Sequence, residues 1–387
     1  MKWQAVEIGA VCNLMTGGTP KTSEPEYYEG GDIPWIVSGD IHKGEIFDCE
    51  KRITTKAVEN SNARYLPKDS VLIALNGQGK TRGTVALLRI ENATCNQSVV
   101  SINPNSKDEL DPEFLFYYLK SQYRQIRNLT GDKDRAGLNM PLLRSISIPL
   151  PPLSDQKRIA AILDKADNLR RKRQQAIQLA DEFLRAVFLE MFGDPVTNPK
   201  KWERKAFSDL GSWSSGGTPS RRVPEYFDGD INWYSAGELN SRYLSGSVEK
   251  ITQDAIENTS ARVFNAGSIL LGMYDTAAFK ASILREDSSS NQACANLKPN
   301  ASVNVEWFYS FIMVAKHHYL SQRRGVRQKN LNLGMIREFE LPLPPIELQM
   351  EYASIVGRVM HIKSAMEGAE AIPLFRSLSQ KAFSGEL

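Results

Sequence analysis

The stretch Ala74–Thr81 comes nearest to a catalytic or ligand-binding motif in this sequence. It ends in Gly79-Lys80-Thr81 and satisfies a relaxed phosphate-binding loop pattern, with Ala in place of the first Gly. Such a loop needs a strand before it and a helix after it, so that the helix N-terminus faces the phosphate. The continuation Arg82–Ala86 predicts a strand instead. We therefore favour a positively charged hairpin loop, with a nucleotide-binding enzyme as the minor alternative.

No other motif of an enzyme is present. The sequence has no HExxH and no GxSxG, and no metal-ligand spacing among its four histidines, His42, His317, His318 and His361. Asp155-Gln156-Lys157 fits the tail of a nuclease motif, but it stands at a predicted helix start, where charge of this kind is ordinary. We expect a non-catalytic chain that holds no metal and no cofactor of its own.

What remains is a set of basic, amide-rich loops that contain glycine. Lys and Arg suit phosphates, and Arg, Asn and Gln suit base edges. The candidate DNA-binding residues are Thr19, Lys21, Gln78, Lys80, Thr81, Arg82, Lys133, Arg135, Arg221, Arg222, Tyr274, Lys280, Arg324, Arg327 and Lys329. For each cluster alone, a solvated surface is the competing explanation. The run Arg170–Arg173 is also basic, and it suits a solvated or partner-facing helix at least as well as a phosphate contact.

The chain repeats itself, which strengthens the binding interpretation. Seven short blocks recur in the same order roughly 195 residues later. They include Gly17-Gly18-Thr19-Pro20, which returns as Gly216-Gly217-Thr218-Pro219, and Ile148–Pro152, which returns as Leu341–Pro345. Both copies place basic loops at matching positions. Residues shared by the copies, such as Trp35 and Trp233 or Asn96 and Asn291, are best explained as scaffold, whereas unlike loops are candidates for reading unlike bases.

Each copy is followed by a long amphipathic segment. From Ser154 to about Phe192, apolar residues recur at 3-4 spacing, and a rod of roughly 39 residues spans about 58 Å. A second such segment runs from Tyr352 to Ala369, and Pro373 then predicts a kink or a restart before a short terminal helix. The predicted coiled-coil interface comprises Ile159, Ile162, Ala166, Leu169, Ala176, Ala180, Phe183, Val187, Ile355, Val359, Ile362 and Met366.

These elements predict an α+β protein with two duplicated globular domains and two long helices in an antiparallel coiled coil. The expected boundaries are residues 1–153 and 194–345 for the domains, and 154–193 and 346–387 for the helices. Inside the first domain, residues 71–75, 84–88 and 98–102 read as strands, and 112–128 as a helix. Its counterpart, residues 305–322, carries aromatic residues at helical spacing that we assign to the core.

Bulk properties agree with this organisation. A chain of 387 residues has room for two or three domains, and its formal net charge of +3 implies no polyanion partner by itself. The four cysteines are scattered without CxxC spacing, which suits a reducing cytosol. No apolar run is long enough to cross a membrane. We expect a cytoplasmic protein without a signal peptide.

Several motifs together resemble the specificity (S) subunits of type I restriction-modification systems, over the whole chain. The resemblance lies in GGTP, PEYYEGGDIPW, NGQGKTRG followed by NQS, GMYDT followed by NQA, IPLPPLSDQKRIAAILDKAD, MFGDP and the terminal QKAFSGEL. It implies that each globule is a target recognition domain and that the two domains read the two halves of an interrupted site in double-stranded DNA. It also implies a coiled coil that spaces the domains and docks two methyltransferase (M) subunits.

The same resemblance implies chemistry in other chains. Adenine methylation with S-adenosylmethionine and ATP-driven, Mg²⁺-dependent cleavage would be performed by the methyltransferase subunits and by restriction/translocase (R) subunits. Because Gln78–Arg82 and Tyr274–Ala277 are unlike loops at matched positions, we expect an asymmetric bipartite target. The alternatives are a non-enzymatic coiled-coil scaffold and a stand-alone DNA-binding protein.

Overall fold

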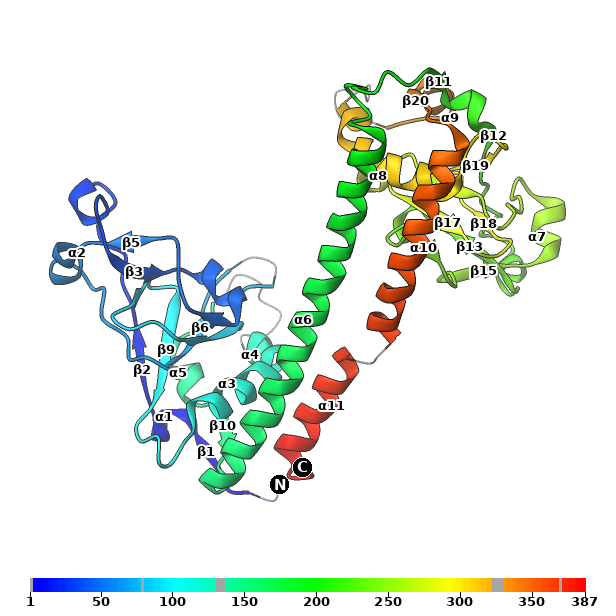
Figure 1. Ribbon diagram of the computed structural model, residues 1–387. Helices are drawn as coiled ribbons and strands as arrows, with labels where there is room; N and C mark the ends of the chain where they lie inside the picture. The colour runs from blue at the N-terminus through cyan, green and yellow to red at the C-terminus, as the bar shows by residue number, and fades with distance from the viewer. Residues whose placement is uncertain (1–2, 78–79, 130–136, 322–329, 369–370) are drawn as a thin grey trace. The chain divides into compact units, whose positions relative to one another are not determined.

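The computed structural model describes residues 3–77, 80–129, 137–321, 330–368 and 371–387, and it divides into two compact units. Domain 1 comprises Met1–Gln174 with Ala369–Leu387, and domain 2 comprises Gln175–Gly368. Each is built from two mixed sheets, a two-stranded ribbon and several helices (Figure 1). The predicted α+β class and the duplication are therefore confirmed.

Domain 1 is centred on a five-stranded sheet in the order β2-β9-β6-β7-β4. A three-stranded sheet has the order β5-β3-β8, and β1 pairs with β10. The predicted strands at 71–75, 84–88 and 98–102 are present as β6, β7 and β9. The bounds are β1 Ala5–Glu7, β2 Cys12–Thr16, β3 Ile33–Ile36, β4 Glu45–Ile46, β5 Arg52–Ile53, β6 Val71–Ala74, β7 Val85–Leu88, β8 Thr94–Cys95, β9 Val99–Pro104 and β10 Ser147–Pro149.

The helices of domain 1 are short and cover the sheet. The segment predicted as one helix, residues 112–128, is divided at Gln122 into α3 and α4, and Phe114, Leu115 and Leu119 of α3 are fully buried. The aromatic face is thus core, as predicted. The helical segments are α1 Ile8–Val11, η1 Pro25–Tyr27, η2 Ser38–Lys43, α2 Thr55–Glu59, α3 Pro112–Ser121, α4 Tyr123–Asn128 and α5 Met140–Arg144.

Domain 2 repeats this topology. Its five-stranded sheet has the order β12-β19-β16-β17-β14, beside β15-β13-β18 and the pair β11-β20. Trp307, Phe308 and Phe311 of α8 are at most 1% exposed, so the second aromatic helix is also core.

The strand bounds in domain 2 are β11 Arg204–Ala206, β12 Gly211–Ser215, β13 Ile231–Tyr234, β14 Tyr243–Leu244, β15 Glu249–Ile251, β16 Ile269–Gly272, β17 Ala281–Leu284, β18 Ser289–Ser290, β19 Cys294–Pro299 and β20 Glu340–Pro342. The helical bounds are η3 Phe207–Leu210, η4 Pro224–Phe227, η5 Ala236–Glu238, α7 Gln253–Asn258, η6 Asp275–Ala277, α8 Val305–Ser321 and α9 Leu333–Glu338.

The long helices are α6 Leu153–Phe192, α10 Ile346–Gly368 and α11 Ala371–Ser384. In domain 2, Lys363 of α10 bonds Asp181 of α6 at 2.8 Å, and the Tyr352 ring lies 5.6 Å from the Phe188 ring. Since positions rise along α6 as they fall along α10, the two segments are antiparallel, as predicted. No helix among the described residues is long and apolar enough to cross a membrane.

The predicted interface positions on these helices do not share one environment. Ile159 and Ala166 are buried, and Val187, Ile355 and Val359 pack partly buried against the core of their domain. Ile162, Ala176, Ala180 and Met366 are half-buried. Leu169, Phe183 and Ile362 are exposed by 44%, 52% and 54%, so the prediction that they pack in the seam is wrong. The buried line in the second half of α6 instead passes through Leu184, Phe188 and Phe192.

In the C-terminal segment α10 ends at Gly368 and α11 begins at Ala371, and residues 369 and 370 lie outside the described part of the chain. Pro373 is the third residue of α11, where a helix leaves its N–H groups unpaired in any case. α11 packs on α3, since the Phe383 ring lies 5.5 Å from Phe114 and 5.1 Å from Tyr118. Residues 371–387 therefore complete domain 1, while α10 belongs to domain 2.

A buried glutamine attaches each domain to the helix that follows it. Gln156 of α6 accepts from the backbone N–H of Asp111 at 2.8 Å and donates to the Glu109 carbonyl at 2.9 Å. In domain 2, Gln349 of α10 accepts from the N–H of Asn304 at 2.9 Å and donates to the Ser302 carbonyl at 3.0 Å. Both side chains are fully buried. We call these two sites the glutamine joints.

Candidate nucleic-acid interface

One end of each five-stranded sheet gathers the loops that the sequence marks as basic or amide-rich. β2, β6 and their antiparallel neighbours β9 and β7 alternate in direction, and β4 runs parallel to β7. The carboxyl ends of β2 and β6 therefore meet the amino ends of β9, β7 and β4. This set of loops, here called the loop edge, comprises residues 17–20, 38–43, 75–77, 80–84 and 96–98 in domain 1, and 216–219, 236–242, 273–280 and 291–293 in domain 2.

The residues shared by both copies build the frame of the loop edge. A Cβ at Gly17 would collide with the carbonyl of Cys95, and one at Gly216 with the carbonyl of Ser290. The indole N–H of Trp35 donates to the Gly18 carbonyl at 3.0 Å, and that of Trp233 to the Gly217 carbonyl at 3.0 Å. These glycines and tryptophans are scaffold, as predicted.

The Asn-Gln pair that precedes β9 and β19 completes this frame. Asn96 Oδ1 accepts from the N–H of Ser98 at 3.1 Å, and Asn291 Oδ1 from that of Ala293 at 3.1 Å. The hydroxyl of Thr19 donates to Gln97 Oε1, and Thr218 bonds Gln292 in the same way. Thr19 is exposed at the loop edge, and a DNA contact there stays a prediction.

In the β6–β7 loop of domain 1, neighbouring candidates point in different directions. Lys80 is exposed, and its carbonyl accepts from the Tyr123 hydroxyl at 2.8 Å. Thr81 Oγ1 lies 2.9 Å from His42 Nε2 of η2. Arg82 is only 7% exposed, so its side chain is poorly placed for the predicted DNA contact. Gln78 lies outside the described residues. β7 rather than a helix follows, which opposes the phosphate-loop interpretation.

The matching loop of domain 2 has other chemistry. Tyr274 is half-buried and packs against the core, and η6 follows it. Lys280 Nζ donates to Asn240 Oδ1 at 2.8 Å. Both candidates thus lie at the loop edge, and Lys280 meets a residue that the sequence analysis did not single out.

The two arginines after the second GGTP motif also differ. Arg221 pairs with Glu249 at 2.8 Å and stacks over the Phe227 ring, with its guanidinium carbon 4.2 Å from the ring centroid. Arg222 and, in domain 1, Lys21 are exposed. Arg222 and Lys21 are therefore better placed for a phosphate than Arg221, which the fold itself holds.

The most basic loops fall between described segments. Lys133, Arg135, Arg324, Arg327 and Lys329 lie outside the described residues. The residues that follow these loops are nonetheless fixed at the loop edge. The N–H of Leu138 donates to the Leu75 carbonyl at 3.0 Å, and that of Leu331 to the Met273 carbonyl at 2.9 Å.

The basic run on α6 is occupied by contacts inside domain 1. Asp167, only 2% exposed, pairs with Lys120 at 2.7 Å and with Arg170 at 2.8 Å. Arg171 reaches Glu45 of β4 at 3.0 Å. Burial by itself would raise the pKa of Asp167, but Lys120 and Arg170 outweigh it and hold that pKa below the usual range. Asp167, through Lys120 of α3, and Arg171, through Glu45 of β4, therefore fasten the helix to domain 1.

Two polar residues of the loop edge, His42 and Asn240, were missed. Each belongs to the segment between the shared tryptophan strand and the edge strand, η2 to β4 in domain 1 and η5 to β14 in domain 2. The signal was present, because the two copies carry different polar residues there: IVSGDIHKGEI follows Trp35 and YSAGELNSRYL follows Trp233.

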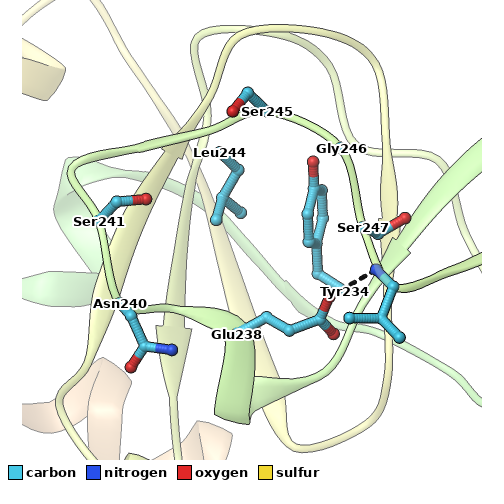
Figure 2. Close-up of a pocket in the computed structure, with 9 residues that line it drawn as sticks. Tyr234, Glu238, Asn240, Ser241, Leu244, Ser245, Gly246 and Ser247 are labelled. Carbon is cyan, nitrogen blue, oxygen red and sulfur yellow. Dashed lines mark hydrogen bonds between the residues drawn. The ribbon is translucent and has the colours of Figure 1, made fainter. Parts of the chain in front are cut away.

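A hollow of about 370 Å³ lies beside this segment in domain 2, lined by nine residues from Tyr234 to Val248 (Figure 2). Its polar groups are mostly paired within the protein. Glu238, for example, accepts from the N–H of Val248 at 2.9 Å, the dashed line in Figure 2. The Tyr234 hydroxyl is buried without a hydrogen-bond partner among the described residues. Asn240 lies on the rim of the hollow.

A family model described as the type I restriction modification DNA specificity domain matches residues 1–179 and 199–370. Similar proteins include the MjaIX specificity subunit of Methanocaldococcus jannaschii, 26% identical over 69% of this chain, and the EcoR124I/EcoR124II specificity subunit of Escherichia coli, 28% identical over 44%. The matched parts span 65% of the first relative and 41% of the second. The EcoBI specificity subunit of Escherichia coli is 22% identical over all of this chain and 86% of its own length.

Solved structures share the fold. A type I restriction-modification S subunit from M. genitalium superposes with a TM-score of 0.64 at 15% identity, over 99% of this chain and 96% of that one. A chain from a type I system studied for complex assembly and conformational transition gives a TM-score of 0.52 at 17% identity, over 100% and 98%.

Proposed function

The chain belongs to the type I restriction modification DNA specificity family, and from this premise we propose that each of its loop edges reads one half of an interrupted DNA site. DNA-target recognition is the function of that family. The finer proposal concerns how this chain divides the task. One observation carries it: the same frame is built twice, with unlike side chains mounted on it.

The frame supports the proposal because it holds the loops of both domains in the same positions, while its own residues are shared and so cannot distinguish one half-site from the other. Trp35 and Trp233, and Thr19 and Thr218, make equivalent bonds in both domains. The β6–β7 loop and the β16–β17 loop mount different polar groups on that frame. Unlike donors and acceptors prefer unlike base pairs. An asymmetric target follows.

We further propose that methyltransferase subunits dock on the long helices, and that S-adenosylmethionine, ATP and Mg²⁺ are bound by partner subunits. The helices of domain 2 expose large apolar side chains, Leu179 by 55%, Phe183 by 52% and Ile362 by 54%. Leu179 and Phe183 are four positions apart and therefore neighbours on one face of α6. Adjoining exposed apolar side chains mark a site of interaction with another protein. The chain itself would then perform no chemistry.

Co-expression with a candidate methyltransferase subunit tests the reading of DNA. Methylated adenines mapped across the host genome should fall within one interrupted motif whose two halves differ in sequence. A continuous motif, or an interrupted motif with identical halves, would contradict the proposal. Methylation absent with every candidate subunit, together with direct duplex binding by the chain alone, would favour a stand-alone DNA-binding protein.

Docking is tested by the variant F183S. We expect it to abolish co-purification of the methyltransferase subunit, because an interface anchor is lost while the fold is kept. The matched control is F47S in domain 1, at a phenylalanine 70% exposed on a strand connection rather than a helix. Retention of the subunit by F183S, or its loss from both variants, would argue against docking at this face.

A further inference from the structure

A contact at the loop edge joins the same two segments in both domains, but with different chemistry and from different positions of the hairpin loop. In each domain it joins the segment before the edge strand to the loop of the neighbouring hairpin. In domain 1 the contact is His42 to Thr81, and in domain 2 it is Asn240 to Lys280. The rest of the loop-edge frame is repeated with the same residues, so this change of partners is informative.

The two positions are equivalent by topology and by their anchors. His42 directly follows Ile41, which is 1% exposed, and Asn240 directly follows Leu239, which is 2% exposed. In both segments a carboxylate closes the preceding turn. Asp40 accepts from the N–H of Val37 at 3.1 Å, and Glu238 accepts from the N–H of Ser235 at 2.8 Å. The fold therefore delivers both side chains to the same point of the edge.

In domain 1, the contact leaves part of the imidazole available. His42 is exposed, and Nε2 lies 2.9 Å from Thr81 Oγ1. The other ring nitrogen, Nδ1, has no partner among the described residues. The contact through Nε2 thus orients the ring, and Nδ1 is left to bond a ligand.

In domain 2, the amide is oriented in the same manner. Asn240 is exposed, its Oδ1 accepts from Lys280 at 2.8 Å, and its Nδ2 donates to the Gly237 carbonyl at 2.7 Å. One amide hydrogen and one oxygen lone pair remain for a ligand. Figure 2 shows Asn240 and Ser241 on one side of the hollow, apart from the Tyr234 ring.

We propose that His42 and Asn240 are specificity-determining residues, each reading a base edge in one half-site, with Thr81 and Lys280 as the residues that orient them. This inference rests on the proposed function and adds which side chains carry it. An oriented amide or imidazole suits base-edge recognition, because fixed donors and acceptors discriminate between base pairs. Because the two domains carry different residue pairs on the same frame, they would read different base pairs.

The test maps methylated adenines for the full complex that carries H42A, H42N, N240A or N240H. H42A and H42N should relax or change one base pair in one half-site, with a loss of discrimination of roughly 5- to 150-fold there. N240A and N240H should act on the other half-site only. K56A is the control, since exposed Lys56 pairs with Glu26 at 2.6 Å away from the loop edge, and its motif should equal that of the wild type.

The outcomes separate this inference from the function on which it rests. If the wild-type complex yields no interrupted motif, the proposed function fails and this inference with it. If the wild-type motif is interrupted and every variant reproduces it, this inference alone is wrong. Complete loss of methylation in both variants at one position would also overturn it, because a single base contact does not carry all of the affinity.

Discussion

Two neighbouring cations of domain 1, Lys80 and Arg82, have opposite environments. Lys80 is exposed at the loop edge, whereas Arg82 is 7% exposed. We expect K80A to weaken DNA binding and to lower the salt dependence of the affinity by about one phosphate contact. R82A removes a buried side chain and should lower the free energy of unfolding of domain 1.

Affinity measured against salt concentration, together with urea unfolding, distinguishes the two variants. K56A is the matched control, because that lysine is exposed away from the loop edge. Unchanged binding by K80A would remove this lysine from the interface. The sequence analysis assigned Lys80 and Arg82 the same role, because a sequence shows residue type and spacing. It does not show the direction of a side chain, which depends on tertiary contacts.

Asp167 is a buried ion-pairing residue of domain 1. Its carboxylate meets Lys120 and Arg170 at a site where it is 2% exposed. D167N leaves the partly exposed cations Lys120 and Arg170 without their buried partner, so the cost should stay below the roughly 3–5 kcal/mol lost on breaking a fully buried pair. We expect domain 1 to lose stability in urea unfolding. The control is D181N, on the same helix, where the aspartate is 58% exposed and its pair with Lys363 should contribute little.

The pH dependence follows from the direction of the shift. The folded-state pKa of Asp167 is lower than in the unfolded chain, because Lys120 and Arg170 outweigh burial. Its stabilisation is therefore present at neutral pH and is lost as the pH falls through the lowered pKa. The difference in unfolding free energy between wild type and D167N should shrink on acidification. A difference that stays constant down to strongly acidic pH would contradict this account.

At the scale of elements, the glutamine joints are the points where recognition domain and helix meet. Q156A removes the partner of the Asp111 N–H, and Q349A that of the Asn304 N–H. Each buried group left unpaired costs about 1–3 kcal/mol. We expect faster hydrogen exchange at the start of α3 in Q156A and at the start of α8 in Q349A. Each variant serves as the control for the other, and equal effects on both helices would contradict two independent joints.

The helices also show where sequence periodicity stops being sufficient. The limits of α6 were predictable, because helix propensity is local. The buried line in the second half of α6 was not. Phe183 and Leu184 differ by one position, about 100° around the helix. Which of the two is buried depends on how α8 and α10 pack against α6, and the periodicity of α6 alone does not contain that information.

At the scale of the whole molecule, the continuous helix α6 offers a way to test spacing. Removing the seven residues 173–179 shortens a helix by about 10 Å, or roughly three base pairs along a duplex. A heptad nearly preserves helical phase. We expect the spacer of the methylated motif to shorten while both half-sites stay the same. Genome-wide mapping of methylated adenines measures both features.

The control replaces residues 173–178 with six helix-favouring residues, which keeps Leu179 of the proposed docking face and should leave the spacer unchanged. If the deletion variant methylates the original motif, the helix does not set the spacing.

The duplicated layout behind this experiment was visible in the sequence as an ordered set of repeats. The assignment of α11 to domain 1 was not, because it depends on the aromatic contacts of Phe375 and Phe383 with α3.

The glutamine joints have a consequence for how such chains change. Both place a glutamine four residues after the last proline of a Pro-Pro pair, Pro152 and Pro345. Both hold the backbone N–H of the residue just before a core helix of their own domain, α3 or α8. A domain from another chain with the same joint would seat on an existing helix without redesign of either part. Recombination at two short stretches of a gene could then create new pairs of half-sites, and the repertoire of targets would grow by exchange as well as by point mutation.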